Sequence, residues 1–116
     1  MSKNIPFNHS KLLVVVTSLP SLDAAKGLAR ALVEQNLAAC AQLTEGIHSI
    51  YRWEGKICEE QEVLLSAKTI EAKWLEILAF IQSAHPYDLP EILAFSPEQH
   101  ERQYGAWVES EVNSKS

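Results

Sequence analysis

Three side chains that can take part in metal or proton chemistry lie close together in one proline-bounded segment. His85, Tyr87 and Glu91 are separated by a short stretch that contains Pro86 and Pro90. Each proline fixes its own φ angle and restricts the residue before it, so a rigid loop is predicted here. Imidazole and carboxylate ligands suit copper, zinc or nickel ions. His85 and Glu91 are therefore candidate metal ligands, and Tyr87 is a candidate residue of a cleft or interface.

A structural role for His85 competes with this interpretation. His85 directly precedes a proline at the predicted end of a helix. An imidazole at that position can hydrogen bond to the last carbonyl groups of the helix. The sequence alone leaves both roles open.

The two cysteines, Cys40 and Cys58, are too few for a disulfide scaffold. Thiolates favour soft cations such as Cu(I), so Cys40 is the third candidate metal ligand. The alternative is that each cysteine is a small, partly buried hydrophobe. In an unbent hairpin that turns at Gly55, the two would lie roughly 40 Å apart at ~3.3 Å per residue. They are not expected to pair within one chain, although two chains could bring them together.

Three carboxylates, Glu59, Glu60 and Glu62, lie within the ten residues that end at Lys68. Alternation along a strand would place Glu60 and Glu62 on one face and Glu59 on the other, which does not make a carboxylate cage. Solvated faces or ion pairs between subunits are the preferred interpretation. Lys68 is assigned to a cleft or interface, where it can also face an anionic ligand.

Composition excludes several classes of function. The chain has 116 residues and a formal net charge of −5, which disfavours binding to phosphate backbones. No apolar run reaches the ~18 residues of a membrane span, and the apolar stretch 12–16 is shorter than a signal-peptide core of ~7 to 15 residues. We therefore expect a cytoplasmic protein without membrane or nucleic-acid partners. HExxH, CxxC, nucleophile-elbow and phosphate-loop motifs are absent, so no enzyme is predicted.

The elements that must hold these residues can be placed by periodicity. Residues 1–10 are predicted to be a flexible arm, 11–17 a buried strand, and 22–36 a helix capped by Ser21 and ending near Asn36. Period-two alternation from 37 to 70 predicts a long hairpin that turns at 54–56. A second helix is predicted over 71–84, with Trp74, Leu75, Leu78 and Ile81 facing inward.

The last elements are a core strand over 91–95 and a helix that begins at Ser96–Gln99, where serine, proline and glutamine form a capping pattern. Residues 113–116 are predicted to be a frayed tail. The whole is a βαββαβ order with an added helix, in one domain over residues 11–112. This is the ferredoxin-like, antiparallel α+β arrangement, with both main helices on one face of the sheet.

The hairpin and several aromatic residues exceed what one chain of this size can cover. Tyr51 and Trp53 lie near the hairpin tip, and Tyr104 and Trp107 form a stripe on the last helix. Trp53, Tyr104 and Trp107 are therefore predicted to lie at an interface, and hairpin edges are expected to pair between subunits.

Several separated segments, in the same order, resemble the CutA divalent-cation-tolerance family. They are Leu37–Ala41, Ile50–Lys56, Glu62–Thr69, His85–Tyr87 followed by Pro90–Ile92, and the pair Tyr104 and Trp107. The resemblance extends over roughly residues 12 to 112. It implies a homotrimer of ferredoxin-like subunits, similar in topology to PII signalling proteins. It also implies a link to tolerance of copper and other divalent cations.

Two functions are compatible with this resemblance. The first is a metal-responsive trimer that binds Cu²⁺ or another divalent cation through His85, Glu91 and Cys40, without an organic cofactor. The second is a PII-like signalling or scaffold trimer whose subunit clefts bind a small molecule or a partner protein. An RNA-recognition module on the same topology is disfavoured, because such modules need stacking aromatics on the central strands and a basic face.

Overall fold

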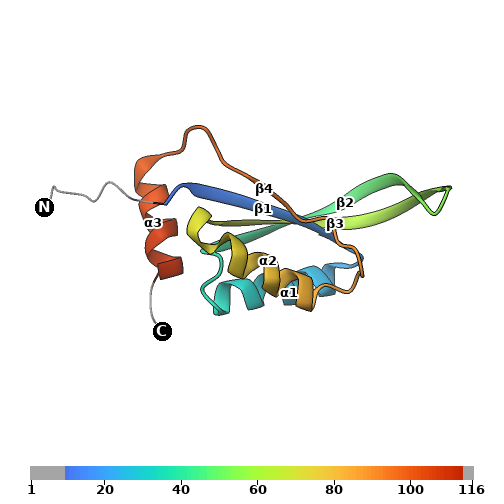
Figure 1. Cartoon of the computed structure of the whole chain (residues 1–116), viewed down its shortest axis with the longest axis horizontal. Helices are drawn as coiled ribbons and strands as arrows, with labels where there is room; N and C mark the ends of the chain where they lie inside the picture. Colours follow the sequence, from blue (N-terminus) through green and yellow to red (C-terminus); the bar gives the residue numbers. More distant parts are fainter. Residues whose placement is uncertain (1–9, 114–116) are drawn as a thin grey trace, which may run out of the picture.

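A computed structural model describes residues 10–113 as a four-stranded antiparallel sheet with helices (Figure 1). The strands run in the order β2-β3-β1-β4, and each pair of neighbours is antiparallel. β1 and β2 are therefore parallel with β3 between them, as the split βαβ arrangement requires. The elements are β1 (Leu12–Leu19), α1 (Leu22–Glu34), β2 (Cys40–Trp53), β3 (Lys56–Ile70), a 3-10 turn (Glu71–Lys73), α2 (Trp74–Ala84), β4 (Leu93–Phe95) and α3 (Arg102–Asn113). The predicted α+β class and order of elements are confirmed.

The main core lies between the sheet and the two helices α1 and α2, which cover the same face (Figure 1). Alternate residues of β1 and β3, among them Val15 and Leu65, point into this core and are fully buried. Burial of each large apolar side chain of this kind is worth roughly 1.5–3 kcal/mol. The inner residues contributed by the helices are Ala25, Leu28, Leu32, Ile77 and Ile81.

Helix α1 follows the prediction closely. Ser21 caps its start, since the Ser21 hydroxyl accepts a hydrogen bond of 3.1 Å from the Ala24 N–H. Asn36 has a φ of 59°, so the chain leaves the helix through the left-handed conformation that asparagine tolerates. In α2 the prediction that Leu75 faces inward is wrong, because Leu75 is 75% exposed and Ile77 is buried instead. The buried stripe runs through Ile77 and Ile81, four residues apart, and Leu75 lies outside it.

The hairpin has a two-residue turn at Glu54 and Gly55, whose φ angles are 50° and 80°. Positive φ at both central positions is typical of the turn that matches strand twist. A hairpin that turns at Gly55 is predicted to place Cys58 opposite Arg52 and Cys40 opposite Ile70. This register is wrong by one or two residues, because Cys58 lies opposite Tyr51 and Cys40 lies opposite Lys68. The turn is one reason for the difference, and an irregularity in β2 is the other.

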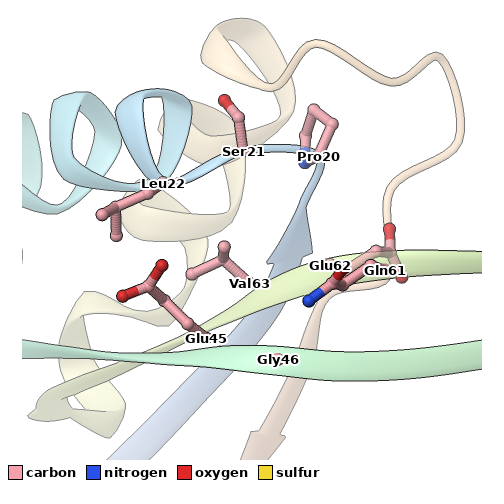
Figure 2. Close-up of a pocket in the computed structure, with 8 residues that line it drawn as sticks. All are labelled: Pro20, Ser21, Leu22, Glu45, Gly46, Gln61, Glu62 and Val63. Atoms are coloured by element: carbon pink, nitrogen blue, oxygen red, sulfur yellow. The ribbon is translucent and has the colours of Figure 1, made fainter.

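That irregularity is a β-bulge at Glu45 and Gly46 (Figure 2). Thr44 pairs with Leu64 and Ile47 pairs with Glu62, so two residues of β2 lie opposite one residue of β3. Gly46 has a φ of 77°, which a residue with a side chain adopts only at a cost. The strands on both sides of the bulge keep regular antiparallel pairing.

The outer half of the hairpin projects from the body as a free two-stranded ribbon. β1 pairs with β3 only from Val63 to Ile70, so residues 56–62 of β3 have β2 as their single neighbour within the described chain. The molecule is correspondingly elongated, with extents of 57 × 29 × 23 Å (Figure 1). We call residues 47–62 the ribbon below.

The last strand is shorter and more exposed than predicted. β4 covers Leu93–Phe95 at the edge of the sheet, opposite Val14–Val16. Leu93 is 48% and Phe95 is 55% exposed. The prediction of a core strand over 91–95 is therefore wrong within a single chain, since β4 is a three-residue edge strand that only β1 pairs with among the described residues, and these two side chains stay about half exposed.

Helix α3 starts later than predicted, at Arg102 instead of near Ser96–Gln99. The Glu101 carboxylate accepts hydrogen bonds from the N–H groups of Gln103 and Tyr104, at 3.1 and 2.7 Å. These two bonds hold the pKa of Glu101 below its ordinary value. A carboxylate that satisfies two free N–H groups and faces the positive end of the helix dipole provides this cap, and the predicted serine cap is not used.

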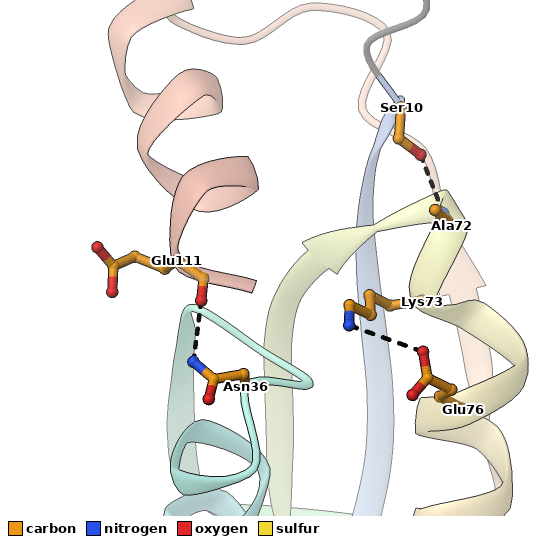
Figure 3. A network of polar contacts seen from close by, with 6 residues as sticks. All are labelled: Ser10, Asn36, Ala72, Lys73, Glu76 and Glu111. Atoms are coloured by element: carbon orange, nitrogen blue, oxygen red, sulfur yellow. Dashed lines mark hydrogen bonds and ion pairs between the residues drawn. The ribbon is translucent and has the colours of Figure 1, made fainter. Parts of the chain in front are cut away.

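α3 packs on the sheet face opposite α1 and α2. Val108 and Val112 bury themselves against Leu12 and Ile70 in a second, smaller core. Two side-chain hydrogen bonds hold this end of the molecule together (Figure 3). The Asn36 amide donates to the carbonyl of Glu111 at 3.0 Å, and the Ser10 hydroxyl accepts from the Ala72 N–H at 2.9 Å. The rest of the predicted arm 1–10 and of the tail 113–116 lies outside the described residues.

Thr17 and Thr69 are fully buried, and their hydroxyl groups have no hydrogen-bond partner among the described residues. A buried hydroxyl that lacks a partner has lost its hydration without compensation. We expect Thr17→Val and Thr69→Val each to raise the free energy of unfolding by about 1 kcal/mol. Denaturant titration measures the change, with the exposed Thr44→Val as control. A loss of stability in both buried variants, but not in the control, would contradict the assignment.

Candidate functional site

Two of the predicted metal ligands meet at one residue, Ser18, near the end of β1. The Ser18 hydroxyl donates to the Glu91 carboxylate at 3.3 Å, and the Ser18 carbonyl lies 2.9 Å from Nε2 of His85. Extending the β1–β4 register places Glu91 opposite Ser18, just beyond the point where β4 begins. Side chains therefore complete the polar contacts of β1 where main-chain pairing has stopped.

Both ring nitrogens of His85 are engaged. The Tyr87 N–H donates to Nδ1 at 3.1 Å, so Nδ1 holds a lone pair and Nε2 carries the proton that goes to the Ser18 carbonyl. His85 is 8% exposed. Burial lowers its pKa from the ordinary value of 6.5, against the opposing effects of the Ser18 bond and the Glu62 charge. His85 is a neutral imidazole that fixes the proline-bounded loop to the end of β1.

Tyr87 extends this cluster to β3. Its hydroxyl donates to the Glu62 carboxylate at 2.7 Å, and its ring lies 5.0 Å from the ring of His85. Burial and the bond to Glu62 raise the pKa of Tyr87 well above its ordinary value. Glu62 itself is only 7% exposed. Ser18, Glu62, His85, Tyr87 and Glu91 form one set of side chains, which we call the Ser18 cluster.

A second tyrosine–carboxylate pair lies on the ribbon beside the Ser18 cluster. The Tyr51 hydroxyl donates to Glu60 at 2.8 Å, and this bond raises the pKa of Tyr51 to about 12. The negative charge of Glu60 also contributes to the raised pKa of Tyr87. The same face of the hairpin therefore presents two carboxylates, each held by a tyrosine hydroxyl.

Cys40 is not part of the Ser18 cluster. Cys40 lies opposite Lys68, whereas Ser18 lies opposite Leu64 on the same strand. Four residues along β3 correspond to roughly 13 Å, and β3 between β1 and β2 adds two strand spacings across the sheet. The structure thus brings His85 and Glu91 together and leaves Cys40 elsewhere on the sheet.

The predicted interface residues are spread over the whole length of the molecule. Lys68 donates a hydrogen bond to the Gln42 side chain on the sheet face that α1 and α2 leave open. Tyr104 and Trp107 stack with ring centroids 5.8 Å apart on α3, at the end of the molecule opposite the ribbon. Trp53 is half exposed at the ribbon tip. One chain does not bring these residues into one cleft.

Within residues 10–113, no three His, Cys, Asp or Glu side chains are arranged so that they could hold a metal ion. His85 and Glu91 offer at most two ligands, and His85 must first release one of its hydrogen bonds. Sequence reasoning missed Glu62 and Ser18 as members of this cluster. The period-two pattern of the strand predicted which face Glu62 lies on but not its partner Tyr87. No pattern in the sequence near Ser18 marks its carbonyl as the group that His85 binds.

The lowered pKa of His85 predicts how stability depends on pH. In the unfolded chain the imidazole of His85 takes up a proton near its ordinary pKa of 6.5, whereas in the folded chain it does so only at lower pH. The contribution of His85 to the free energy of unfolding is therefore complete above about pH 6.5. It is lost as the pH drops toward the lower pKa of the folded state. His85→Gln keeps a donor for Ser18 and cannot titrate. We expect wild type to lose more stability than this variant between about pH 7 and about pH 5. Denaturant titration at fixed protein concentration tests this, and equal losses would contradict it.

Comparison with known proteins gives a consistent result. Residues 13–111 match the family described as "CutA1 divalent ion tolerance protein". The chain is 40% identical over 95 residues to the divalent-cation tolerance protein CutA of Thermus thermophilus, covering 82% of this chain and 92% of that protein. It is 42% identical over 97 residues to human protein CutA, covering 84% of this chain and 54% of the human protein. The chain thus spans about half the length of its human relative.

Solved structures agree in fold. The structure of CutA from Synechococcus elongatus superposes with a TM-score of 0.86 and 36% identity, covering 90% of this chain and 93% of that one. CutA1 from Thermus thermophilus gives a TM-score of 0.84 and 38% identity, with coverage of 86% and 97%. Among residues 10–113, no helix is long and apolar enough to span a membrane. The chain belongs to the CutA1 divalent ion tolerance protein family.

Proposed function

We propose that this protein acts in divalent-cation tolerance in the cytoplasm as a homotrimer that binds copper or another divalent cation, and that it is not an enzyme. Membership of the CutA1 family supports the role in cation tolerance. The observation that carries the rest is the Ser18 cluster, in which two candidate ligands, His85 and Glu91, converge on one residue. A polar cluster of this kind, with too few ligands in one chain, favours a site completed by another subunit.

The chemistry of the cluster defines what each residue would do. Within residues 10–113, the Glu91 carboxylate is held by a 3.3 Å bond from the Ser18 hydroxyl, which is long enough to be easily redirected. His85 supplies Nδ1 if the N–H of Tyr87 is released, while Nε2 keeps its bond to Ser18 and fixes the ring. A hydrogen bond from the ring nitrogen that does not bind the metal orients a ligating imidazole. Cys40, which is too far away in the same chain, would come from a neighbouring subunit.

The trimer is supported by surfaces that a single chain leaves uncovered. Phe95 on β4, Trp107 on α3, and Trp53 and Ile57 on the ribbon are large apolar residues that are 43–60% exposed. β2 and β4 are the two edges of the sheet, and each presents unpaired main-chain groups. Pairing between copies would satisfy these edges and bury the exposed side chains.

A second candidate function is a PII-like signalling or scaffold trimer that binds an anionic small molecule or a partner protein in its clefts. Lys68 favours this possibility. Lys68 is a half-buried residue on the open face of the sheet, and its ammonium group donates an exposed hydrogen bond to the neutral side chain of Gln42. An accessible cation whose hydrogen-bond partner is neutral is a suitable contact for an anion.

Titration calorimetry of the tag-free protein with Cu²⁺ and Zn²⁺ tests the metal site. We expect His85→Ala and Cys40→Ala each to weaken binding by about tenfold or more, since removing even a supporting group costs about 10- to 100-fold. The exposed His48→Ala serves as control and should bind like wild type. Binding that is unchanged by both substitutions would exclude the proposed ligands.

The trimer is tested by light scattering with and without Cu²⁺. We expect three times the mass of one chain, and a stable monomer would exclude the trimer.

A thermal-shift screen of nucleotides and other anionic metabolites tests the second candidate. A ligand that binds only the folded protein stabilises it by about 2.7 kcal/mol at 100 times its dissociation constant. We expect a ligand of the Lys68 face to raise the unfolding midpoint of wild type and to lose this effect in Lys68→Met. Lys26→Met, on the exposed side of α1, should behave like wild type. No shift across a broad panel would argue against this function.

A further inference from the structure

The bulge at Glu45 and Gly46 lies where the support of the hairpin changes. Leu19, the last residue of β1, pairs with Val63, and Val63 is the residue of β3 that faces the bulge. On one side of this point β3 has a neighbour on each edge. On the other side the ribbon continues with two strands only. The bulge therefore separates a supported part of the hairpin from an unsupported one.

The bulge is not needed to form the cross-strand pairs of the hairpin. Thr44 pairs with Leu64 before it and Ile47 pairs with Glu62 after it. Removing one of the two bulge residues would leave a single residue opposite Val63 and would keep both of these pairs. What a bulge adds is a local bend and a stronger twist in its strand. Its effect is on the direction of the ribbon and not on its pairing.

The bend is a property of β2 itself. Gly46 has a φ of 77°, and no atom lies within 4 Å of the position that a Cβ would occupy. Glycine is therefore favoured here by the backbone angle and not by a crowded neighbour. An open groove of about 400 Å³ separates the bulge from Pro20, Ser21 and Leu22 at the start of α1 (Figure 2). Packing against the helix does not impose the bend.

The ribbon beyond the bulge carries large apolar side chains that remain exposed in the single chain. Ile50 and Ile57 are 67% and 60% exposed, and Trp53 lies at the tip. Both of its strands have an unpaired outer edge within the described chain. Such edges pair readily with another strand if its direction and distance are right. The direction of the ribbon is therefore critical for a second copy of the chain.

We infer that the Glu45–Gly46 bulge is a positioning element that aims the ribbon at a second copy of this chain. This inference rests on the trimer proposed above and goes beyond it, because it assigns the geometry of assembly to one surplus residue in β2. Removal of that residue would leave a paired but misdirected ribbon, and assembly would be lost while the subunit stayed folded.

Deletion of Gly46 tests this directly. We expect wild type to have three times the mass of one chain by light scattering, and the deletion variant to have the mass of a monomer at the same concentration. Cross-strand nuclear Overhauser effects between Tyr51 and Cys58 should persist in the variant, which shows that the ribbon is still formed. Gly46→Asn is the matched control, because asparagine tolerates positive φ and keeps the residue count. It should remain trimeric.

The outcomes separate this inference from the proposed trimer. A trimeric wild type with an equally trimeric deletion variant would overturn the positioning role and leave the trimer intact. A monomeric wild type would overturn both. If the contacts between Tyr51 and Cys58 disappear on deletion of Gly46, Glu45 is deleted and Gly46 is kept. That variant has glycine opposite Val63, and its mass and ribbon contacts are measured in the same way. A trimeric, folded Glu45-deletion variant would then overturn the inference.

Discussion

The strands of this sheet differ greatly in length, and most features of the molecule follow from that mismatch. β3 has 15 residues and β2 has 14, whereas β1 has eight and β4 has three. A sheet is stable where each strand has neighbours and a covered face. Here the core between sheet and helices ends with β1, and the long strands continue beyond it. The chain therefore needs a means to finish β1, and the ribbon beyond β1 is left with two strands only, which the proposed trimer would direct and cover.

The end of β1 is finished by side chains in place of a strand. β4 reaches only as far as Leu93, opposite Val16. Beyond it, His85 donates to the Ser18 carbonyl and Glu91 accepts from the Ser18 hydroxyl. A buried carbonyl without a partner would be costly, so these contacts stabilise the fold before any ligand is considered. The structural and metal-binding interpretations of His85 are thus compatible, because one ring nitrogen can hold β1 while the other is exchanged between Tyr87 and a ligand.

Patterns within one element could be predicted from the sequence, and relations between elements were harder. Ser21 and Asn36 marked the ends of α1 because their side chains act on the nearest backbone groups. Alternation along β3 is confirmed, since Leu65 points into the core and Glu62 lies on the opposite face of the sheet. The bulge was missed, because a glycine in a strand can mark either a bulge or simple tolerance, and only the partner strand distinguishes them. The start of α3 was misplaced because Ser96–Gln99 carries a serine and proline start pattern, whereas the helix uses the Glu101 carboxylate as its cap.

The candidate site shows the same division. His85, Tyr87 and Glu91 could be grouped from their spacing in one rigid loop, and the structure places all three in one cluster. Their partners, Ser18 and Glu62, come from β1 and β3, so only the strand order 4-1-3-2 brings them to the loop. Among residues 10–113, Cys40 has no partner in this cluster, since its pairing with Lys68 fixes its position on β2. In the proposed trimer, a metal site that includes Cys40 would therefore be formed between subunits, and the direction of the ribbon would determine its geometry as much as the ligands would.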